Sequence, residues 1–282
     1  MMKHIPVMID NVMEMIGDIN GRHVIDATFG AGGYSRRFLE SGAYVTAFDR
    51  DPNVTTDADK MADEFGNRFR FIHAPFSSVA ELKEKFDAIV FDLGISSMQI
   101  DNPERGFSFR ANAPLDMRMS SVGPTIRDMF EQWTVQEIAQ ILRNFGDIRS
   151  ATAIANAIKR TMPKTTFELR DLIHNPRDVA PVFQSLRIAL NDEMGELVRA
   201  LSAVPDLLKP GGRCLCVTFH SIEDRIVKNT FRDWTTPHGD PHMPTLNTPK
   251  FKLLRAMTPS DAEITSNSRA RSAHLRGVVK SC

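Results

Sequence analysis

The chain has 282 residues and equal numbers of basic and acidic side chains, 35 Lys and Arg against 35 Asp and Glu. This length suits one large domain or one domain with an insertion, and 42% apolar and 25% charged residues are ordinary for a globular protein. A net charge of zero excludes a basic field over the whole protein, so any nucleic-acid site has to be local. Apolar runs long enough to cross a membrane and the apolar core of a signal peptide are both missing, so we expect a cytoplasmic protein.

A helix, a buried strand, a glycine turn and a second helix are predicted in succession near the N-terminus. Residues 7–16 carry an apolar stripe at helical spacing, and residues 23–29 begin with β-branched strand formers. The glycines of Gly30–Gly33 permit a tight turn and a close approach of the backbone to a ligand. A helix over 36–40 follows. Strand, glycine turn and helix together are typical of a nucleotide-type cofactor site.

The second predicted strand, 44–49, ends in an acid, and this helps to choose the cofactor. Asp49 at the tip of that strand suits the diol of a ribose. The glycine pattern G-A-G-G-Y-S lacks the third glycine of the dinucleotide fingerprint G-x-G-x-x-G. Asp26, just before the turn, repels a pyrophosphate but can face a cationic sulfonium and an amino group. S-adenosylmethionine (SAM) therefore fits better than NAD, and the alternative is a strand–helix turn without a ligand.

Three more strands are predicted, at 68–73, 86–93 and 213–219. Strands that alternate with helices favour an α/β fold with a mostly parallel sheet and helices on both faces. In such folds, ligands bind at the carboxyl ends of the strands. Phe76 and Asp92 follow or end two of these strands, so we expect them near the cofactor.

The fourth and fifth strands are separated by about 120 residues, which is too long for one crossover helix. Residues 94–119 are rich in Gly, Pro, Ser and Asp and are predicted to form a long ordered loop. Residues 126–183 show helical periodicity, which predicts a helical insertion with its own small core. Residues 182–208 are then predicted to form a single helix that leads back to the sheet.

Cys214 and Cys216 alternate along the fifth strand and share one face. Two cysteines at this spacing, without further ligands nearby, are a poor zinc signal. We expect them to be buried apolar residues, and we expect no metal site.

The C-terminal residues 250–282 are rich in basic residues, and 266–276 is also rich in serine. One interpretation is a solvated tail, and Leu275 and Val278–Val279 are candidates for an edge strand within it. The other is an arm whose Arg269 and Arg271 contact phosphates, which adds affinity but little sequence specificity.

Residues at the strand ends and in the loop after the fourth strand are candidates for binding or catalysis. Asp92 ends an apolar strand and can accept a hydrogen bond from the adenine amine or from a substrate amine; its alternative role is a helix N-cap. Phe76 can lie against the adenine ring or be part of the core. The loop after the fourth strand mixes arginine with phenylalanine, which suits phosphate contact and base stacking on a splayed nucleotide. His220 is either a proton shuttle or a hydrogen-bonded structural histidine. The loop residues in question are Arg105, Phe107, Phe109 and Arg118.

Eight motifs occur in an order that resembles the bacterial 16S ribosomal RNA cytosine-N4 methyltransferases, and the resemblance covers nearly the whole chain, from His4 to Arg276. It departs from the family pattern at Tyr34, where histidine is common, and at Met98, where proline is common. The motifs are Asp26–Ser35, Phe48–Pro52, Asp92–Ser97, Pro103–Phe109, Pro114–Met119, Phe183–Ile188, Asn191–Glu196 and Thr218–Arg225.

The resemblance implies a Rossmann-like class I methyltransferase sheet with an inserted helical domain. It implies methyl transfer from SAM to the N4 amine of a cytidine in the decoding region of 16S ribosomal RNA, with Asp92 in the catalytic role and with the small ribosomal subunit as partner. The methyltransferase domain is expected at 1–107 and 183–282, and an RNA-recognition insertion at 108–182. The family's cofactor contacts fall on Gly32, Gly33, Tyr34, Asp49, Phe76, Asp92 and Gln99.

Other functions stay open at this point. A SAM-dependent methyltransferase that acts on protein or DNA needs the same strand-end acid. A non-catalytic SAM- or RNA-binding factor is disfavoured by the intact Asp26, Asp49 and Asp92. A nicotinamide oxidoreductase is the weakest alternative, because the third glycine is missing.

Overall fold

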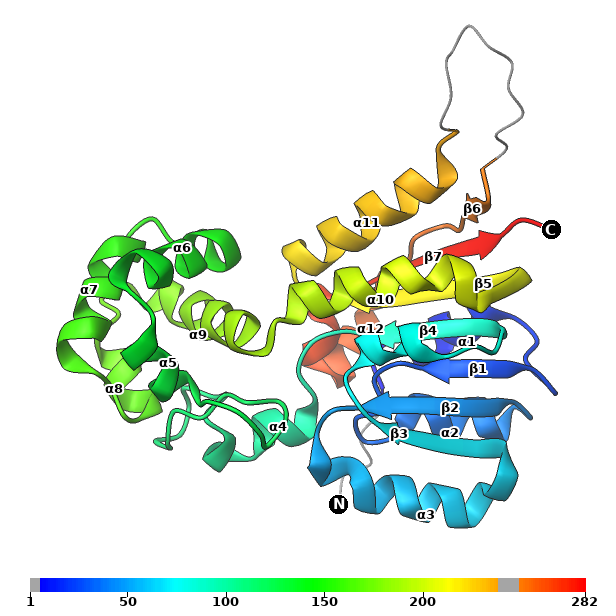
Figure 1. Ribbon diagram of the computed structural model, residues 1–282, viewed down its shortest axis with the longest axis horizontal. Coiled ribbons are helices and arrows are strands. Elements are labelled where there is room, and N and C mark those ends of the chain that lie inside the picture. The colour runs from blue at the N-terminus through cyan, green and yellow to red at the C-terminus, as the bar shows by residue number, and fades with distance from the viewer. Residues whose placement is uncertain (1–5, 238–248) are drawn as a thin grey trace, which may run out of the picture. The chain divides into compact units, whose positions relative to one another are not determined.

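The structure is a computed structural model, and it describes residues 6–237 and 249–282. The chain divides into two compact units (Figure 1). Unit 1 consists of Met1–Gly94 and Gly195–Cys282, and unit 2 consists of Ile95–Met194. Among the described residues, no helix is both long and apolar enough to span a bilayer.

Unit 1 contains a seven-stranded sheet of order β3-β2-β1-β4-β5-β7-β6. The first five strands are parallel, and β7 runs antiparallel between β5 and β6. The expected α/β, Rossmann-like sheet is therefore confirmed, and its parallel strands end on one common edge. The strands are β1 (His23–Asp26), β2 (Tyr44–Asp49), β3 (Phe69–His73), β4 (Phe86–Asp92), β5 (Leu208–Thr218), β6 (Phe251–Leu253) and β7 (His274–Lys280).

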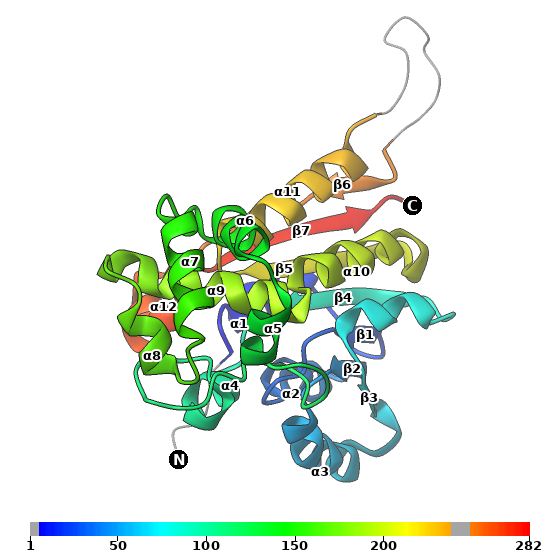
Figure 2. The same ribbon diagram turned by 60° about the vertical axis from the view of Figure 1, so that its left-hand side comes forward.

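Helices cover both faces of this sheet with separate apolar cores (Figure 2). One face packs against α1 (Ile9–Ile16), α2 (Gly33–Glu40) and α3 (Thr55–Phe65). The other face packs against α10 (Glu193–Leu207) and α11 (Ser221–Thr235). Alternate residues of each central strand enter opposite cores, because successive strand side chains point to opposite faces.

The two strand cysteines lie in the second of these cores. Cys214 and Cys216 are both fully buried and reduced, packed with apolar residues of α10 and α11. Burial raises the pKa of the Cys216 thiol well above its usual range. The prediction that both are apolar core residues is confirmed.

The prediction of a solvated C-terminal tail is wrong, whereas contact of Arg269 and Arg271 with phosphates stays a prediction. Residues 250–282, expected as a solvated tail or an arm, form β6, the helix α12 (Asp261–Ser266), a short 3₁₀ turn and β7. β7 pairs with β5 from Arg213↔Val279 to Thr218↔His274. β7 also pairs with β6, so this part of the C-terminal region lies inside the sheet. Leu275 and Val278 of β7 are completely buried.

Unit 2 is helical and has one apolar core of its own, as expected. Its helices bury Ile126, Ile138, Ile154, Leu169 and Phe183, among others, in a single cluster. The loop before them also contributes to this core. The helices are α4 (Ser97–Asp101), α5 (Ile126–Gln132), α6 (Val135–Gly146), α7 (Ala151–Thr161), α8 (Thr166–Asp171) and α9 (Pro176–Asn191).

The units divide at 94/95 and 194/195, whereas the sequence placed the insertion at 108–182. Side chains of the loop after β4, such as Leu115, and of α9 pack into the core of unit 2, which moves both boundaries outward. The single helix expected over 182–208 is wrong. Asp192 adopts a left-handed conformation (φ 50°) and caps α9, so α10 starts anew at Glu193.

Candidate functional site

The end of β1 carries a buried acid that shapes the glycine turn. Asp26 is 1% exposed. Its Oδ2 accepts a hydrogen bond from the Ser35 hydroxyl at 2.6 Å, and its Oδ1 accepts one from the Thr28 N–H at 3.2 Å. Burial raises the pKa of Asp26 to about 6, against the two hydrogen bonds, and the Asp49 charge adds to the rise. Asp26 therefore ties β1 to the turn and to α2, so its carboxylate does not stand open towards a ligand as the sequence had suggested.

The end of β2 holds Asp49 against the same turn. Its Oδ2 accepts the Gly30 N–H at 2.7 Å, and its Oδ1 accepts the Asp51 N–H at 2.9 Å. Asp49 is only partly buried, and burial raises its pKa. Each carboxylate oxygen can accept a second hydrogen bond, so the side chain is suited to a diol.

Gly32 and Gly33 of the turn are covered by other protein atoms on the side where a Cβ would stand. Gly32 has φ 75°, and a Cβ there would lie 2.8 Å from Phe29 Cζ. A Cβ on Gly33 would lie 2.2 Å from Pro6 Cγ. These glycines therefore make room for packing inside the protein, and a ligand has to meet their backbone groups.

Tyr34 is a core residue. It is 3% exposed, its ring lies 6.0 Å from that of Phe38, and its hydroxyl donates a hydrogen bond to the Val7 carbonyl. Burial raises its pKa well above the usual range, and the charges of Asp92 and Asp26 add to the rise. Its hydroxyl is thus directed to the N-terminal segment.

Asp92 lies at the end of β4, next to the end of β1 in the sheet. Its N–H donates to Thr28 Oγ1 at 2.8 Å, which joins β4 to the glycine turn. Within residues 6–237 and 249–282, its buried Oδ1 has no hydrogen-bond partner. Burial holds the pKa of Asp92 well above its usual range, and Asp26 and Glu223 add to the effect. An orphaned buried acceptor is costly, and it is expected where a ligand supplies the donor.

Phe76 begins a 3₁₀ turn after β3 and remains partly exposed. Its ring meets that of Phe91 edge-on at 6.0 Å. Phe76 therefore packs on Phe91 of β4 and stays partly exposed, which is compatible with both of the roles considered for it.

His220 begins α11 as its N-cap. Its Nδ1 accepts the Glu223 N–H at 3.4 Å, and its Nε2 lies 2.9 Å from Glu223 Oε1, although these two atoms are not aligned as a hydrogen bond. Glu223 is 1% exposed, and its Oε2 accepts the N–H groups of Phe219 and His220. Both ring nitrogens face Glu223, which favours the structural role for His220.

The remaining cofactor candidate and four substrate candidates lie in unit 2. Gln99 is 5% exposed, and its Oε1 accepts the Ser96 N–H in a capping box that starts α4. Arg105 donates from Nη2 to the carbonyls of Arg118 and Met119, at 2.8 and 3.0 Å.

The other candidates of the loop are also engaged within unit 2. Arg118 forms a two-pronged ion pair with Asp116, at 2.8 and 2.6 Å, which lowers the Asp116 pKa. Phe107 lies under the Arg105 guanidinium at 5.7 Å, and Phe109 meets Phe183 at 5.5 Å. These contacts shape the loop, and any contact of these residues with RNA stays a prediction.

Two substrate candidates lie on the 3₁₀ turn Ser268–Ser272 of unit 1. Arg269 and Arg271 are both exposed. Arg276, further along, is paired with Asp224 at 2.6 Å and 2.9 Å and holds β7 to α11. The basic stretch thus contains both surface arginines and a structural one.

Sequence reasoning missed the residues that organise these acids. Thr28, Ser35 and Glu223 make the hydrogen bonds that place Asp26, Asp92 and the β5–α11 corner. Two signals for these hydrogen bonds were present in the sequence: the hydroxyl of Thr28, two residues after Asp26, and the hydroxyl of Ser35 in the first turn of α2.

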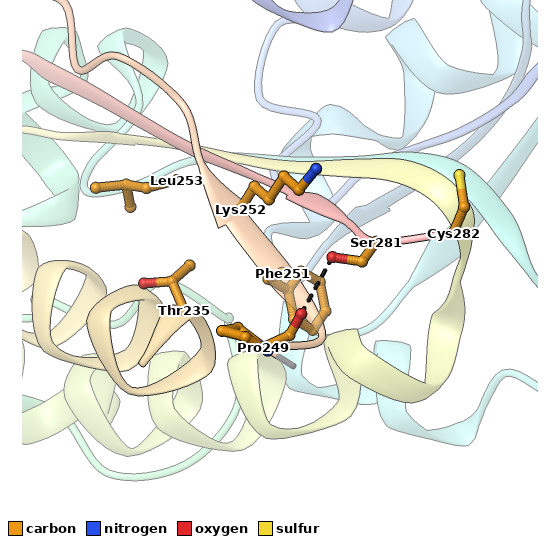
Figure 3. A pocket seen from close by; sticks show the side chains of 7 residues that line it. All are labelled: Thr235, Pro249, Phe251, Lys252, Leu253, Ser281 and Cys282. Atoms are coloured by element: carbon orange, nitrogen blue, oxygen red, sulfur yellow. Dashed lines mark hydrogen bonds between the residues drawn. The ribbon is translucent and has the colours of Figure 1, made fainter. Parts of the chain in front are cut away.

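A hollow of about 660 Å³ lies elsewhere in unit 1 (Figure 3). It is bordered by Lys252, Leu253 and Ser281, and Ser281 Oγ donates to the Pro249 carbonyl at 3.1 Å. Since Val279 pairs with Arg213, near the start of the long strand β5, this hollow lies towards the amino ends of the parallel strands. It is therefore separate from the acids described above. The described residues contain no cluster of three or more His, Cys, Asp or Glu side chains that could bind a metal.

Comparison with known proteins decides the family. The model of the MraW methylase family matches residues 1–281. The chain belongs to the MraW methylase family. A relative from Mesorhizobium japonicum, named ribosomal RNA small subunit methyltransferase H, is 42% identical over 99% of this chain and 87% of its own length. A relative of the same name from Chelativorans is 43% identical over 97% of this chain and 86% of its own. A solved rRNA methylase from Streptococcus thermophilus aligns over 100% of this chain and 99% of its own, with a TM-score of 0.46 and 13% identity.

Membership of the MraW methylase family gives the strand-end acids a chemical context. Asp26, Asp49 and Asp92 end neighbouring strands of one sheet, and Glu223 lies close enough to Asp92 to influence its charge. A cation placed beside such carboxylates lowers their pKa values again, because opposite charges favour the ionised forms. The site therefore suits a ligand with positive charge and hydrogen-bond donors.

Proposed function

We propose that the protein transfers a methyl group from SAM to the N4 amine of a cytidine in the decoding region of 16S ribosomal RNA. One observation carries this proposal in a chain of the MraW methylase family: the buried, unpartnered Oδ1 of Asp92 at the end of β4, among the described residues. The names of the relatives, ribosomal RNA small subunit methyltransferase H, support the small ribosomal subunit as the partner. The proposed place of reaction is the cytoplasm.

SAM fits the residues of unit 1. When bound, it supplies an electrophilic methyl group on a sulfonium. Asp49 would hold the ribose diol, and Phe76 would lie against the adenine. The backbone at Gly32 and Gly33 and the carboxylate of Asp92 would border the cationic methionine part. Gln99 and the backbone at Tyr34 complete the proposed set of cofactor contacts.

Asp92 would act on the substrate amine. The N4 lone pair of cytosine is delocalised into the ring, so the amine needs an acceptor that draws its N–H into place. Asp92 Oδ1 is such an acceptor. When the amine takes the methyl group from the sulfonium of SAM, it would lose one proton, and Asp92 or a water molecule would take it up. Holding the amine in line for this displacement is the larger task of the site.

Unit 2 is proposed to recognise the RNA. A cytidine has to leave its stack to reach a strand-end site, at a cost of a few kcal/mol. Arg105, Phe107, Phe109 and Arg118 are proposed to meet it from unit 2. His220, Arg269 and Arg271 are proposed to meet the RNA from unit 1.

The test is single-turnover methylation of small-subunit RNA, with the product nucleosides identified by mass spectrometry. The wild type should form N4-methylcytidine, and Asp92→Asn should lose it while the fold is retained. The matched control is Asp87→Asn, because Asp87 lies on the same strand at its amino end. Methylation of protein or DNA in place of the RNA, or normal transfer by Asp92→Asn, would contradict the proposal.

A further inference from the structure

The segment Pro6–Ile9, here called the N-terminal strap, crosses the glycine turn of unit 1. The Pro6 ring packs directly on Gly33, where a Cβ would lie 2.2 Å from Pro6 Cγ. The Val7 carbonyl accepts the hydrogen bond of the Tyr34 hydroxyl. The strap is therefore held against the first turn of α2 by a steric fit and by one buried hydrogen bond.

A second anchor comes from the far end of the chain. The Met8 N–H donates to Glu263 Oε1 at 2.5 Å, and Glu263 belongs to α12. Met8 itself is 1% exposed and has φ 55°, the left-handed region that side chains other than glycine rarely adopt. Such conformations persist where the surrounding contacts determine them, and they cluster at functional sites.

The strap lies next to the acids of the candidate site. Ser35, the neighbour of Tyr34 in the first turn of α2, donates its hydroxyl to Asp26 at 2.6 Å. The charges of Asp92 and Asp26 also raise the pKa of the Tyr34 hydroxyl, which bonds the strap. Those two acids end β4 and β1, and ligands of open α/β sheets bind at this edge. The strap therefore borders the place where the proposed cofactor would bind.

We infer that the N-terminal strap forms one wall of the cofactor site, and that Tyr34 and Glu263 are positioning residues that hold this wall. The inference rests on the proposed function, because the ligand in question is SAM. It gives the Tyr34 hydroxyl a definite task at a position where the family often has histidine. It also makes α12, about 250 residues away in sequence, part of the support of the cofactor site.

The first test compares the two tyrosines of the chain. Tyr34→Phe removes only the hydroxyl, and the KM for SAM should rise roughly three- to tenfold, the effect of one lost buried hydrogen bond. The KM for RNA should stay unchanged. Tyr44→Phe is the matched control, because Tyr44 is 38% exposed at the amino end of β2. Equal KM values for SAM in Tyr34→Phe and Tyr44→Phe would overturn the inference.

The second test measures the strap itself by hydrogen exchange of the peptide that contains residues 6–9. Glu263→Ala should speed exchange of this peptide and raise the KM for SAM, whereas Asp261→Ala on the same helix should do neither. Added SAM should slow exchange of the strap in the wild type. Exchange that SAM leaves unchanged would contradict the inference.

The double variant Tyr34→Phe with Glu263→Ala separates a shared wall from two unrelated defects. If both residues hold the same strap, the combined rise in KM is smaller than the product of the single effects. A full product would overturn the shared role. Failure of the proposed function looks different: the wild type would then bind no SAM in calorimetry, whereas failure of this inference leaves SAM binding intact and insensitive to all three variants.

Discussion

Replacing Asp26 with asparagine should change the pH dependence of stability in a defined direction. Burial raises the folded-state pKa of Asp26 from its ordinary value of 3.8 to about 6. The folded protein therefore binds this proton more tightly than the unfolded chain does, so stability falls as the pH rises between these two values. Since each pH unit corresponds to about 1.4 kcal/mol, the ionised Asp26 costs the folded state roughly 3 kcal/mol above pH 6.

The Asp26→Asn variant removes this cost and keeps the geometry, because an amide can still accept the Thr28 N–H and bond the Ser35 hydroxyl. The two proteins should have similar stability near pH 4, and the variant should be more stable by roughly 3 kcal/mol at neutral pH. The other acids are present in both proteins, so the difference reports on Asp26 together with the effect of its charge on Asp92 and Tyr34.

The assay is urea unfolding at several pH values in a Trp133→Phe background. The chain has two tryptophans, and this background leaves Trp234, whose ring packs at a tilt against Phe231 and Phe251, to report on unit 1 alone. Separate reporting matters because two compact units need not unfold together. A stability difference that does not change between acidic and neutral pH would refute the reasoning.

Three further predictions concern binding and the loop of unit 2. Asp49→Ala should weaken SAM by roughly 1–3 kcal/mol in titration calorimetry, since a charged acceptor is lost; unchanged affinity would remove Asp49 from the site. Arg105→Ala should lower methyl transfer while SAM binding stays intact, and it should destabilise unit 2 by about 1–3 kcal/mol because two carbonyls lose a charged donor; a SAM defect would contradict the division between cofactor site and substrate loop. Arg269→Gln together with Arg271→Gln should reduce the salt dependence of RNA binding without changing SAM affinity, because phosphate contacts release counterions; an unaltered salt slope would leave these arginines outside the RNA interface.

The sequence predicted the parallel part of the fold well, because that part follows local rules. The strand Tyr44–Asp49 is apolar, alternates with helices and has the predicted bounds. The parallel topology then placed Asp26, Asp49 and Asp92 on one edge. β7 was anticipated only as an edge strand at Leu275 and Val278–Val279. It lies between β5 and β6, and because its partner β5 is far away in sequence, this pairing depends on tertiary contacts.

The site was predicted in position but not in detail. A strand-end acid can be recognised from the sequence, whereas its hydrogen-bond partners depend on rotamers and packing. Ser35 binds Asp26 and leaves it little freedom, and Arg105 supports backbone carbonyls of its own loop. The helix break at Asp192 was missed because a left-handed aspartate at the end of a helix has no strong sequence signal.

The position of β7 between β5 and β6 sets an order of events during protein synthesis. At translation rates of about 5–20 residues per second, roughly 12–50 s separate the synthesis of α1 from that of α12 and β7. β5 ends at Thr218 and β7 begins at His274, so about 56 residues are made between them and β5 presents an unpaired backbone edge for roughly 3–11 s. During this time the edge is prone to wrong pairing with other chains. Glu263 lies 11 residues before the start of β7, so the nascent chain can fasten the strap and then close its sheet in quick succession. A ribosome that stops before residue 263 would release a chain with both an open sheet edge and an unfastened strap.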